Sequence, residues 1–267
     1  MSSTKYQLQN FIGGGKIGKV YHANNLESGE KVIIKVMKHT EKYKDNINRD
    51  VNIPQLIVHD NIIKILDYYE KEGYCYIVYP YVENALSIEQ ILKLNKMTKK
   101  KNIIWLLKSM LQISAAIEFM HSKSVVHRDI KPSNIIINDY IAILIDFDLA
   151  STVNNPMFPI RRGIIGTPNY LDPAIWTFSD NISYQSTDVY SFGITLYFIF
   201  NKQTYPYRAN TLEKLEYAIR YNKPIPSKSG LPELDKLIMT IIDKNPKMRP
   251  EIYNIKISLC QITSTLL

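Results

Sequence analysis

Cysteine is scarce in this sequence of 267 residues, which contains only Cys75 and Cys260, far apart in the chain. Two cysteines at that separation form neither a zinc-type spacing nor a dense disulfide framework, so we expect free thiols in a reducing compartment. Long hydrophobic runs are also missing, because polar or small residues interrupt the longest one, Val189 to Phe200. That run is shorter than the roughly 20 apolar residues that span a bilayer. We interpret it as a buried helix and expect no membrane partner.

The N-terminus lacks the apolar core of a secretory signal, since residues 1–7 are mostly polar. We accordingly expect an intracellular protein, cytoplasmic or nuclear, in the host cell if the source is viral. The composition is 45% hydrophobic and 22% charged, which permits a sizeable core and argues against bulk disorder. The net charge of +8 favours acidic or phosphate-rich ligands, although solvated lysines explain most of it, and a nucleic-acid partner is not required.

The most informative stretch is residues 127–134, with the sequence His-Arg-Asp-Ile-Lys-Pro-Ser-Asn. Moving a phosphoryl group to a hydroxyl requires a carboxylate near the hydroxyl proton, positive charge near the transferring group, and a ligand for a metal ion. Asp129, Lys131 and Asn134 supply these three functions within six positions. A polar turn between a helix and a strand is the alternative interpretation. The complete set of residues favours phosphoryl-transfer chemistry.

A glycine-rich segment, Ile12 to Tyr21, contains the pattern G-x-G-x-x-G, and a β-branched run from Val32 ends at Lys35. Glycines let backbone amides approach phosphates closely, but a glycine-rich hairpin turn would show the same pattern. No βαβ unit follows and no Gly-Lys-Ser/Thr ends the pattern, so a dinucleotide fold and a Walker loop are disfavoured. The candidate nucleotide-binding residues in this region are Ile12, Gly13, Gly14, Gly15, Lys16, Ile17, Gly18, Lys19, Val20, Ile33 and Lys35.

These motifs, with the sequence Asp-Phe-Asp at residues 146–148, resemble the motif set of the eukaryotic protein-kinase family. The resemblance covers about Tyr6 to Thr265 and implies a single kinase domain over residues 1–267. The implied fold is α+β and bilobal, with a small β-rich N-lobe over 1–82 and a larger helical C-lobe over 83–267. The frequent use of Ile, Asn, Lys and Tyr suggests an AT-rich genome, and the minimal domain resembles kinases of large DNA viruses, including baculoviruses, or of parasites.

The resemblance also implies the roles of individual residues. Asp129 and Lys131 would be catalytic, and Asn134 and Asp146 would bind Mg²⁺, with Mn²⁺ as an alternative. Lys35 would bind the α- and β-phosphates of ATP, and the phosphoryl acceptor would be a protein substrate. Thr167, in a Gly-Thr-Pro segment, and Lys131 together resemble serine/threonine kinases, and Gly-Thr-Pro resembles a peptide-docking loop.

Residues 40–58 should hold a helix whose acid pairs with Lys35, and the family position falls on Asp50, where the family has Glu. Asp is one methylene shorter, so the pair would be stretched or the helix would sit closer. Pro54 removes a hydrogen bond to the carbonyl of Asp50, so we expect the helix to end or kink near Asn52–Ile53. A weakly held helix would suit an activating partner or a homodimer.

The segment from residue 62 to 82 is predicted to form two strands, Ile62–Glu70 and Tyr74–Tyr79, followed by the hinge between the lobes. By resemblance, Tyr79 would be the gatekeeper at the back of the adenine pocket. Pro80 would offer only its carbonyl to adenine, and Val82 would supply an N–H. Beyond the hinge, we expect helices over 84–122, a hairpin of residues 135–137 and 141–145, a buried helix from Asp188, and three more helices. By resemblance, Asp188 would cap the backbone of the catalytic loop.

Besides Asp50, two further positions depart from the family pattern. Asp148 replaces the Gly of Asp-Phe-Gly, and because Gly makes this hinge easy to flip, we expect a disfavoured Phe147-out state. Ala174 replaces a Glu that normally pairs with a buried arginine, here Arg249. An unpaired buried charge is costly, so Arg249 needs another acceptor, and Asp172 is the candidate.

Arg128 occupies the position that in this family binds a phosphate on the activation loop. Residues 153–165 nevertheless contain no Ser, Thr or Tyr, and Arg161 and Arg162 stand where a phosphosite is common. We hypothesise that activity does not require phosphorylation of this loop. The favoured interpretation is an active serine/threonine kinase; a nucleotide-binding pseudokinase that acts as a scaffold is the alternative, and a small-molecule kinase is disfavoured by the Gly-Thr-Pro segment.

Overall fold

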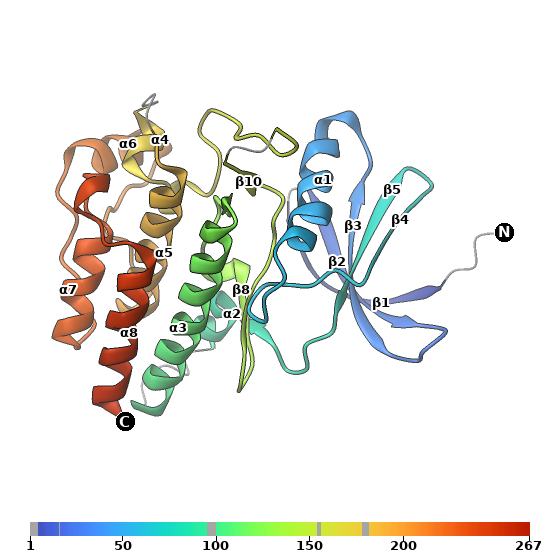
Figure 1. Ribbon diagram of the computed structural model, residues 1–267, viewed down its shortest axis with the longest axis horizontal. Coiled ribbons are helices and arrows are strands. Elements are labelled where there is room, and N and C mark those ends of the chain that lie inside the picture. The colour runs from blue at the N-terminus through green and yellow to red at the C-terminus, as the bar shows by residue number, and fades with distance from the viewer. Residues whose placement is uncertain (1–4, 16, 95–99, 154–155, 178–181) are drawn as a thin grey trace.

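The computed structural model describes the whole chain except residues 1–4, 16, 95–99, 154–155 and 178–181. A five-stranded antiparallel sheet lies at one end of the molecule and a larger group of helices at the other (Figure 1). This arrangement confirms the expected α+β fold with a small β-rich N-lobe and a larger helical C-lobe. The strands pair in the order β1-β2-β3-β5-β4, with bounds β1 Tyr6–Gly14, β2 Gly18–Asn25, β3 Lys31–Lys38, β4 Asp67–Lys71 and β5 Tyr74–Pro80.

Strand β3 directs its lysine toward the interior because successive side chains of a strand point to opposite faces. Val32 and Ile34 are buried in a small cluster on one face of the sheet. Lys35 therefore lies on the other face, opposite Ile77 of β5, and Ile33 lies opposite Tyr79. Ile77 and Tyr79 belong to the main hydrophobic core, so the sequence of β3 places Lys35 beside that core.

Helix α1, Glu41–Leu56, continues through Pro54, so the predicted end near Asn52–Ile53 was wrong and the alternative of a kink there stays a prediction. Pro54 stands in the last turn, where only one helical hydrogen bond depends on its missing N–H. Ile53 is fully buried and Pro54 is also buried, so packing holds this turn against the core. The backbone N–H of Ile57 donates to the carbonyl of Pro54 over 3.4 Å and closes the helix.

The predicted strand Ile62–Glu70 was wrong in its first half, since β4 begins at Asp67. Ile62 forms only an isolated bridge with Leu144, and the N–H of Ile63 donates to the carbonyl of Leu144 over 3.0 Å. Both isoleucines are buried. Their β-branched side chains therefore pack against the catalytic hairpin of the C-lobe and not within the N-lobe sheet, a choice that local propensity does not decide.

The C-lobe is mainly helical, with short strands around the catalytic loop (Figure 1). The predicted hairpin forms from β8 and β9, and β6 adds a third strand to it. The helices and strands of the C-lobe are β6 Leu86–Ser87, α2 Ile88–Lys93, α3 Lys100–Ser122, β7 Val125–Val126, η1 Pro132–Asn134, β8 Ile135–Ile137, β9 Ala142–Leu144, β10 Ser151–Thr152, η2 Pro168–Tyr170, α4 Pro173–Trp176, α5 Tyr184–Phe200, α6 Leu212–Tyr221, α7 Pro232–Ile241, η3 Pro246–Met248 and α8 Ile252–Leu266.

One stretch of α3, Asn102–Ser122, is long and apolar enough to cross a membrane, with a mean hydropathy of 1.5. Half of the tested window is buried inside the protein. The predicted apolar stripe of this helix supplies fully buried residues, including Leu106, Leu107 and Met110. Core helices pass the same test of length and hydropathy, so this stretch is weak evidence for a membrane span.

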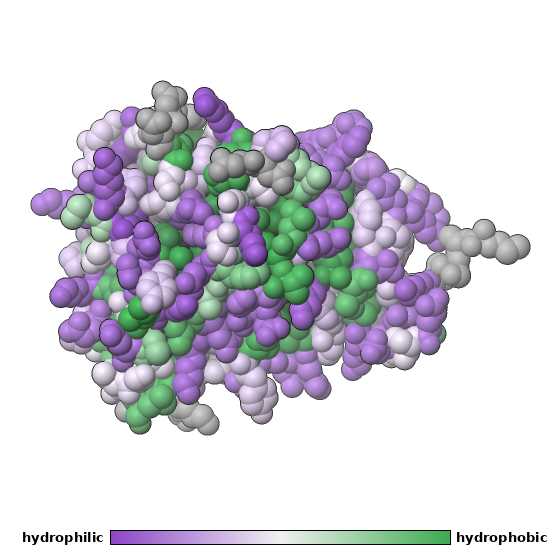
Figure 2. Space-filling view, in the orientation of Figure 1, coloured by the Kyte–Doolittle hydropathy of each residue, from purple (hydrophilic) through white to green (hydrophobic). Residues whose placement is uncertain are grey.

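The exposed face in Figure 2 is mostly hydrophilic, with hydrophobic side chains gathered near its middle, between the helical and the sheet-rich parts. Exposed hydrophobic residues include Leu56 at the end of α1, Val58 just beyond it and Leu66 directly before β4. Scattered exposed hydrophobic residues are normal on protein surfaces.

Gly193 lets α5 and α7 approach closely, and we expect Gly193→Ala to destabilise the fold. An added Cβ would lie 2.4 Å from Cγ2 of Ile241 and 2.8 Å from Cγ2 of Ile242. Overpacking of this kind costs about 1–3 kcal/mol, of which the better helix propensity of alanine offsets about 1 kcal/mol. Urea denaturation would measure the loss. Combining Gly193→Ala with Ile241→Ala should cost less than the sum of the two single changes, whereas strict additivity would argue against this clash.

Candidate active site

Lys35 on β3 joins an acid of α1 to an acid that follows β9. Its Nζ donates to Oδ2 of Asp50 over 2.7 Å and to Oδ1 of Asp146 over 2.6 Å. The predicted pairing of Lys35 with Asp50 is therefore confirmed, and the shorter acid does not stretch it. The other oxygen of Asp50 accepts the backbone N–H of Phe147 over 3.0 Å, so α1 sits close enough for both contacts.

The charges of this group support one another. Burial alone would lower the pKa of Lys35, but Asp146 and Asp50 raise it well above its usual range. Burial would raise the pKa of Asp146, yet Lys35 lowers it below its usual range. Burial and the charge of Asp146 raise the pKa of Asp148 to about 7. Lys35 and Asp146 are thus held in their charged forms, as a phosphate-binding cation and a metal-binding anion require.

The catalytic loop holds the carboxylate of Asp129 between several donors. Lys131 Nζ donates to Oδ2 of Asp129 over 2.6 Å, and Asn134 Nδ2 donates to the same oxygen over 3.2 Å. Thr167 donates to Oδ1 through its backbone N–H over 3.1 Å and its hydroxyl over 2.7 Å. Lys131 also donates to the hydroxyl of Thr167 over 2.8 Å. The structure therefore brings the predicted catalytic pair together with Thr167.

The sequence did not predict the contact of Thr167 with Asp129, because their side chains meet across 38 positions of the chain. The Gly-Thr-Pro motif marked Thr167 only as a sign of a serine/threonine kinase and of a peptide-docking loop. The turn before it depends on Gly166, whose φ of 124° is unfavourable for other residues. A Cβ there would also lie 2.8 Å from the carbonyl oxygen of Arg128.

Asp188 supports the backbone of the catalytic loop. Its carboxylate accepts the N–H groups of His127 and Arg128, each over 2.8 Å, and lies 3.0 Å from Nε2 of His121. The prediction that Asp188 contacts this loop is confirmed. The prediction that α5 begins there was wrong, because α5 begins at Tyr184 and Ser183 caps it. A serine hydroxyl is a good helix cap, so the carboxylate is left to support the loop.

Phe147 is fully buried between the two lobes, and its ring meets that of His127 edge-on with centroids 4.8 Å apart. The Phe-in arrangement coexists with the Asp146 contact to Lys35. The effect of Asp148 on the flipped state stays a prediction.

The glycine-rich segment forms the turn between β1 and β2, where the N–H of Gly15 donates to the carbonyl of Gly18 over 2.9 Å. Lys16 lies outside the described residues. A Cβ at Gly18 would lie 3.3 Å from Cγ of Lys35, so the structure places this turn directly against the lysine. Ile12, Gly13 and Gly14 belong to the end of β1, and Lys19 and Val20 to the start of β2.

The predicted hinge residues lie at and just beyond the end of β5 in the same sheet. Tyr79 is buried on the face that carries Lys35, and Pro80 ends β5 opposite Val32. Ile17 and Val82 are partly buried and pack against the main core. Their predicted contacts with ATP stay predictions.

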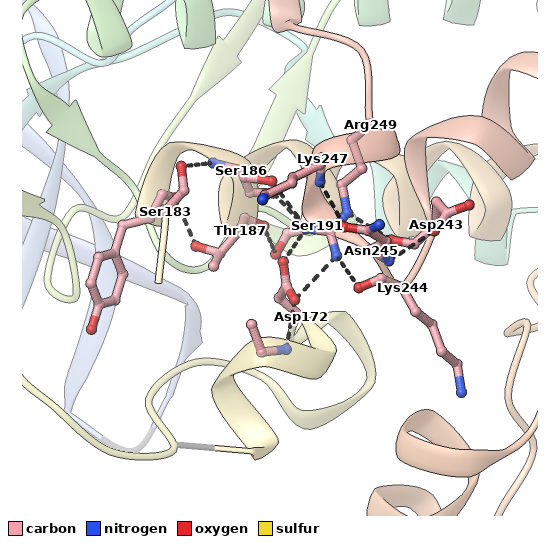
Figure 3. Close-up of polar contacts among 12 residues, drawn as sticks. Asp172, Ser183, Ser186, Thr187, Ser191, Asp243, Lys244, Asn245, Lys247 and Arg249 are labelled. Atoms are coloured by element: carbon pink, nitrogen blue, oxygen red, sulfur yellow. Dashed lines mark hydrogen bonds and ion pairs between the residues drawn. The ribbon is translucent and has the colours of Figure 1, made fainter. Parts of the chain in front are cut away.

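Asp172 replaces the missing glutamate as the partner of Arg249, as predicted. Arg249 Nη2 donates to Oδ1 of Asp172 over 3.2 Å, and Nη1 contacts Oδ2 of the same carboxylate. Figure 3 shows the arginine reaching Asp172 between the start of α5 and the loop before η3. Its other acceptors include the carbonyl of Asp243 at 2.7 Å and that of Ser186 at 3.1 Å, which the sequence did not suggest. Asp172 also accepts the N–H of Ala174 over 2.7 Å and caps α4.

Asn134 and Asp146 offer the donor types that Mg²⁺ prefers, an amide oxygen and a carboxylate. The side chain of Asp146 is 32% exposed, so its carboxylate is accessible while Lys35 holds one oxygen. The part of the chain that the structure describes contains no group of three or more His, Cys, Asp or Glu suited to a metal ion. Mg²⁺ commonly uses only one or two protein ligands beside substrate phosphates, so the pair fits it.

A family model described as the protein kinase domain matches residues 6–258 of this chain. The chain belongs to the protein kinase family. A protein of Acanthamoeba polyphaga mimivirus, named "Putative serine/threonine-protein kinase", is 43% identical over 260 residues, which are 96% of this kinase and 94% of that protein. CBL-interacting protein kinase 14 of Oryza sativa subsp. japonica and human serine/threonine-protein kinase Nek5 are 28% and 30% identical over 94% of this kinase.

This kinase spans 57% of the rice protein and 36% of the human one. Among these three relatives, the mimivirus protein matches it over almost the full length of both chains. The family match and the names of these relatives identify a protein serine/threonine kinase. The mimivirus relative also agrees with the predicted similarity to kinases of large DNA viruses.

Proposed function

We propose that this kinase transfers the γ-phosphoryl group of ATP to serine or threonine hydroxyls of a protein substrate. The proposal rests on one observation, that two groups of contacts are formed at the same time in this structure. Lys35 bridges Asp50 and Asp146, while Asp129 is held by Lys131 and Thr167. Positioning and electrostatics supply most of the catalysis in phosphoryl transfer, so these charges are what the reaction needs.

The acceptor hydroxyl would lie near Asp129, whose carboxylate orients it and accepts its proton. The ammonium of Lys131 lies 2.6 Å from that carboxylate and would stabilise negative charge on the transferring group. Thr167, 2.7 Å from Asp129, would help to orient the carboxylate. Lys35 would bind the α- and β-phosphates, with the backbone amides of the glycine-rich turn above them.

Asn134 and Asp146 would hold Mg²⁺, which supplies charge neutralisation on the phosphates when it is bound. Asp146 is already fixed by Lys35, and Asn134 is fixed by the carbonyl of Asp129, to which its Nδ2 donates over 2.9 Å. The side chains are therefore oriented before any ligand arrives, which lowers the cost of binding. Mn²⁺ would use the same oxygen donors.

The pseudokinase alternative depended on the irregular residues of the sequence. Asp50 still reaches Lys35, and Arg249 still finds a carboxylate, so neither departure removes a reacting group. The location in the cytoplasm or nucleus of a host cell stays a prediction, as does an activating partner or a homodimer.

The direct test is transfer of labelled phosphate from ATP to a generic protein substrate in the presence of magnesium. We expect label on serine or threonine, none on tyrosine, and loss of transfer when EDTA removes the metal. Protein carrying Asp129→Asn, purified in parallel, provides the background of contaminating kinases. Magnesium-dependent ATP binding without any transfer would contradict the proposal and support a nucleotide-binding scaffold.

A further inference from the structure

Arg49 of α1 is almost completely buried, with 1% of its surface exposed, and it reaches into the segment that follows Asp146. Its Nη1 donates to the carbonyl of Ala150 over 2.7 Å and to the hydroxyl of Ser151 over 2.9 Å. Its Nη2 donates to the carbonyl of Pro159 over 2.9 Å. The residue precedes Asp50 directly, so the element that carries the Lys35 partner is fastened to this segment.

Arg128 of the catalytic loop reaches the same place from the C-lobe. Its Nη2 donates to the carbonyl of Arg161 over 2.8 Å, and its Nη1 lies 3.4 Å from the hydroxyl of Ser151. Burial lowers the pKa of Arg128 to about 10, which leaves it charged at neutral pH. One serine hydroxyl therefore joins guanidinium groups from α1 and from the catalytic loop.

A third arginine, Arg161, lies in the segment itself and contacts α1. Arg161 donates to the carbonyl of Asp148 over 3.2 Å and to the side chain of Asn46 over 3.3 Å, and its Nη1 lies 3.3 Å from Asp45. Asn46 also donates to the carbonyl of Asp148 over 3.1 Å. Asp45, Asn46 and Arg49 of α1 thus contact residues on both sides of this segment, from Asp148 to Ser151 and from Pro159 to Arg161.

Backbone carbonyls accept from all three arginines, and among the described residues Nε of Arg161 is the one buried arginine nitrogen without a partner. The two terminal nitrogens of Arg49 already donate to acceptors of the segment, and its Nε donates to Asp45 over 2.9 Å. Ser151 is fully buried, and Thr152 is 5% exposed, so neither hydroxyl is accessible to a second kinase in this arrangement. Residues 153–165 have no hydroxyl side chain. All three nitrogens of Arg49 are therefore engaged by the chain itself and not by a phosphate.

We propose that Arg49 is a positioning residue that locks α1 to the backbone of Ala150 and Pro159 in the catalytic arrangement without a phosphate. The inference rests on the proposed function and adds its regulation. Because Arg49 and Asp50 are adjacent on α1, the contacts of Arg49 set how far Asp50 reaches toward Lys35 and the N–H of Phe147. Phosphorylation of the segment is then unnecessary for activity.

The test compares phosphatase-treated wild type with Arg49→Met and Arg49→Lys, each confirmed as unphosphorylated by mass spectrometry. Treated wild type should keep its full rate of transfer. Arg49→Met should lower kcat/KM for ATP by about 10- to 100-fold, the factor for losing one hydrogen bond to a charged group. Arg49→Lys keeps the charge and should recover part of that loss. Arg220→Met, which breaks an exposed pair with Glu216 on α6, is the matched control and should change nothing.

Hydrogen exchange gives a second readout that does not depend on transfer. The amides of α1 and of residues 147–152 should exchange faster in Arg49→Met, while those of α5 and α8 keep their protection. This pattern separates a local release from general unfolding, and Arg49→Lys serves if Arg49→Met is unstable. If wild type transfers no phosphate, the proposed function fails, and the exchange pattern alone decides whether Arg49 fastens α1.

Two results would overturn the inference. One is loss of transfer after phosphatase treatment that rephosphorylation restores. The other is an Arg49→Met protein whose kcat/KM for ATP and whose hydrogen exchange in α1 equal those of wild type.

Discussion

Asp129→Asn should lower kcat about 10²- to 10⁴-fold, which is the range that a positioned general base contributes. The carboxylate accepts hydrogen bonds on both oxygens, from Lys131 and Asn134 on one and from Thr167 on the other. In the asparagine, an NH₂ donor replaces one of the two acceptor oxygens, and it then faces the donor groups from which that oxygen accepted. The variant would lose the proton acceptor and also disturb its support.

The rate loss should occur with little change in ATP affinity, because Lys35 and Asp146 remain in place. Steady-state kinetics gives kcat, and titration with a fluorescent nucleotide gives the dissociation constant. Asp139→Asn changes the same functional group on an exposed turn and should keep the wild-type rate. An Asp129→Asn protein with wild-type kcat would show that this carboxylate is not the proton acceptor.

Asp172→Ala should destabilise the fold by about 3–5 kcal/mol, because it leaves the buried charge of Arg249 without its carboxylate. Both side chains are 1% exposed. The arginine keeps the carbonyl acceptors of Asp243 and Ser186 and lies over the ring of Tyr190, but none of these carries a negative charge. The loss is a large fraction of the about 5–15 kcal/mol that stabilises a typical domain.

Urea denaturation of Asp172→Ala, Arg249→Met and the double variant would measure the coupling between the two residues. The double variant should lose less stability than the sum of the single changes, because removing both charges leaves neither unpaired. Glu216→Ala removes the partner of Arg220 in an exposed pair and should cost at most about 0.5 kcal/mol. Equal losses for Asp172→Ala and Glu216→Ala would contradict a buried ion pair.

Asp172 takes over the role of the glutamate that the family has at the position of Ala174. Ala174 follows Asp172 by two positions, and its N–H donates to the same carboxylate that pairs with Arg249. One aspartate therefore caps α4 and neutralises the arginine. The family resemblance identified Arg249 as an arginine that had lost its glutamate at position 174, and the cost of an unpaired buried charge then pointed to Asp172, two positions away from Ala174.

Sequence patterns predicted the active-site motifs well because their residues are close in the chain. Residues 127–134 place Asp129, Lys131 and Asn134 on one short loop, so no fold is needed to bring them near one another. The bilobal fold followed from matching these motifs to a family and not from periodicity. The boundaries were less reliable, since α1 passed through Pro54 and β4 began at Asp67. In both places burial against the core outweighed local preference.

The sequence by itself determined which chemical groups this kinase has: the lysine of β3, the predicted catalytic aspartate, the predicted metal-binding pair and a stretch, 153–165, without hydroxyl side chains. Only the tertiary structure decided which groups meet. Arg49 finds the carbonyl of Ala150 across 101 positions, and Thr167 finds Asp129 across 38. Backbone carbonyls occur at every residue, so no sequence pattern marks the ones that a buried arginine will use. Packing selects them, because a buried donor must be paired where it comes to rest.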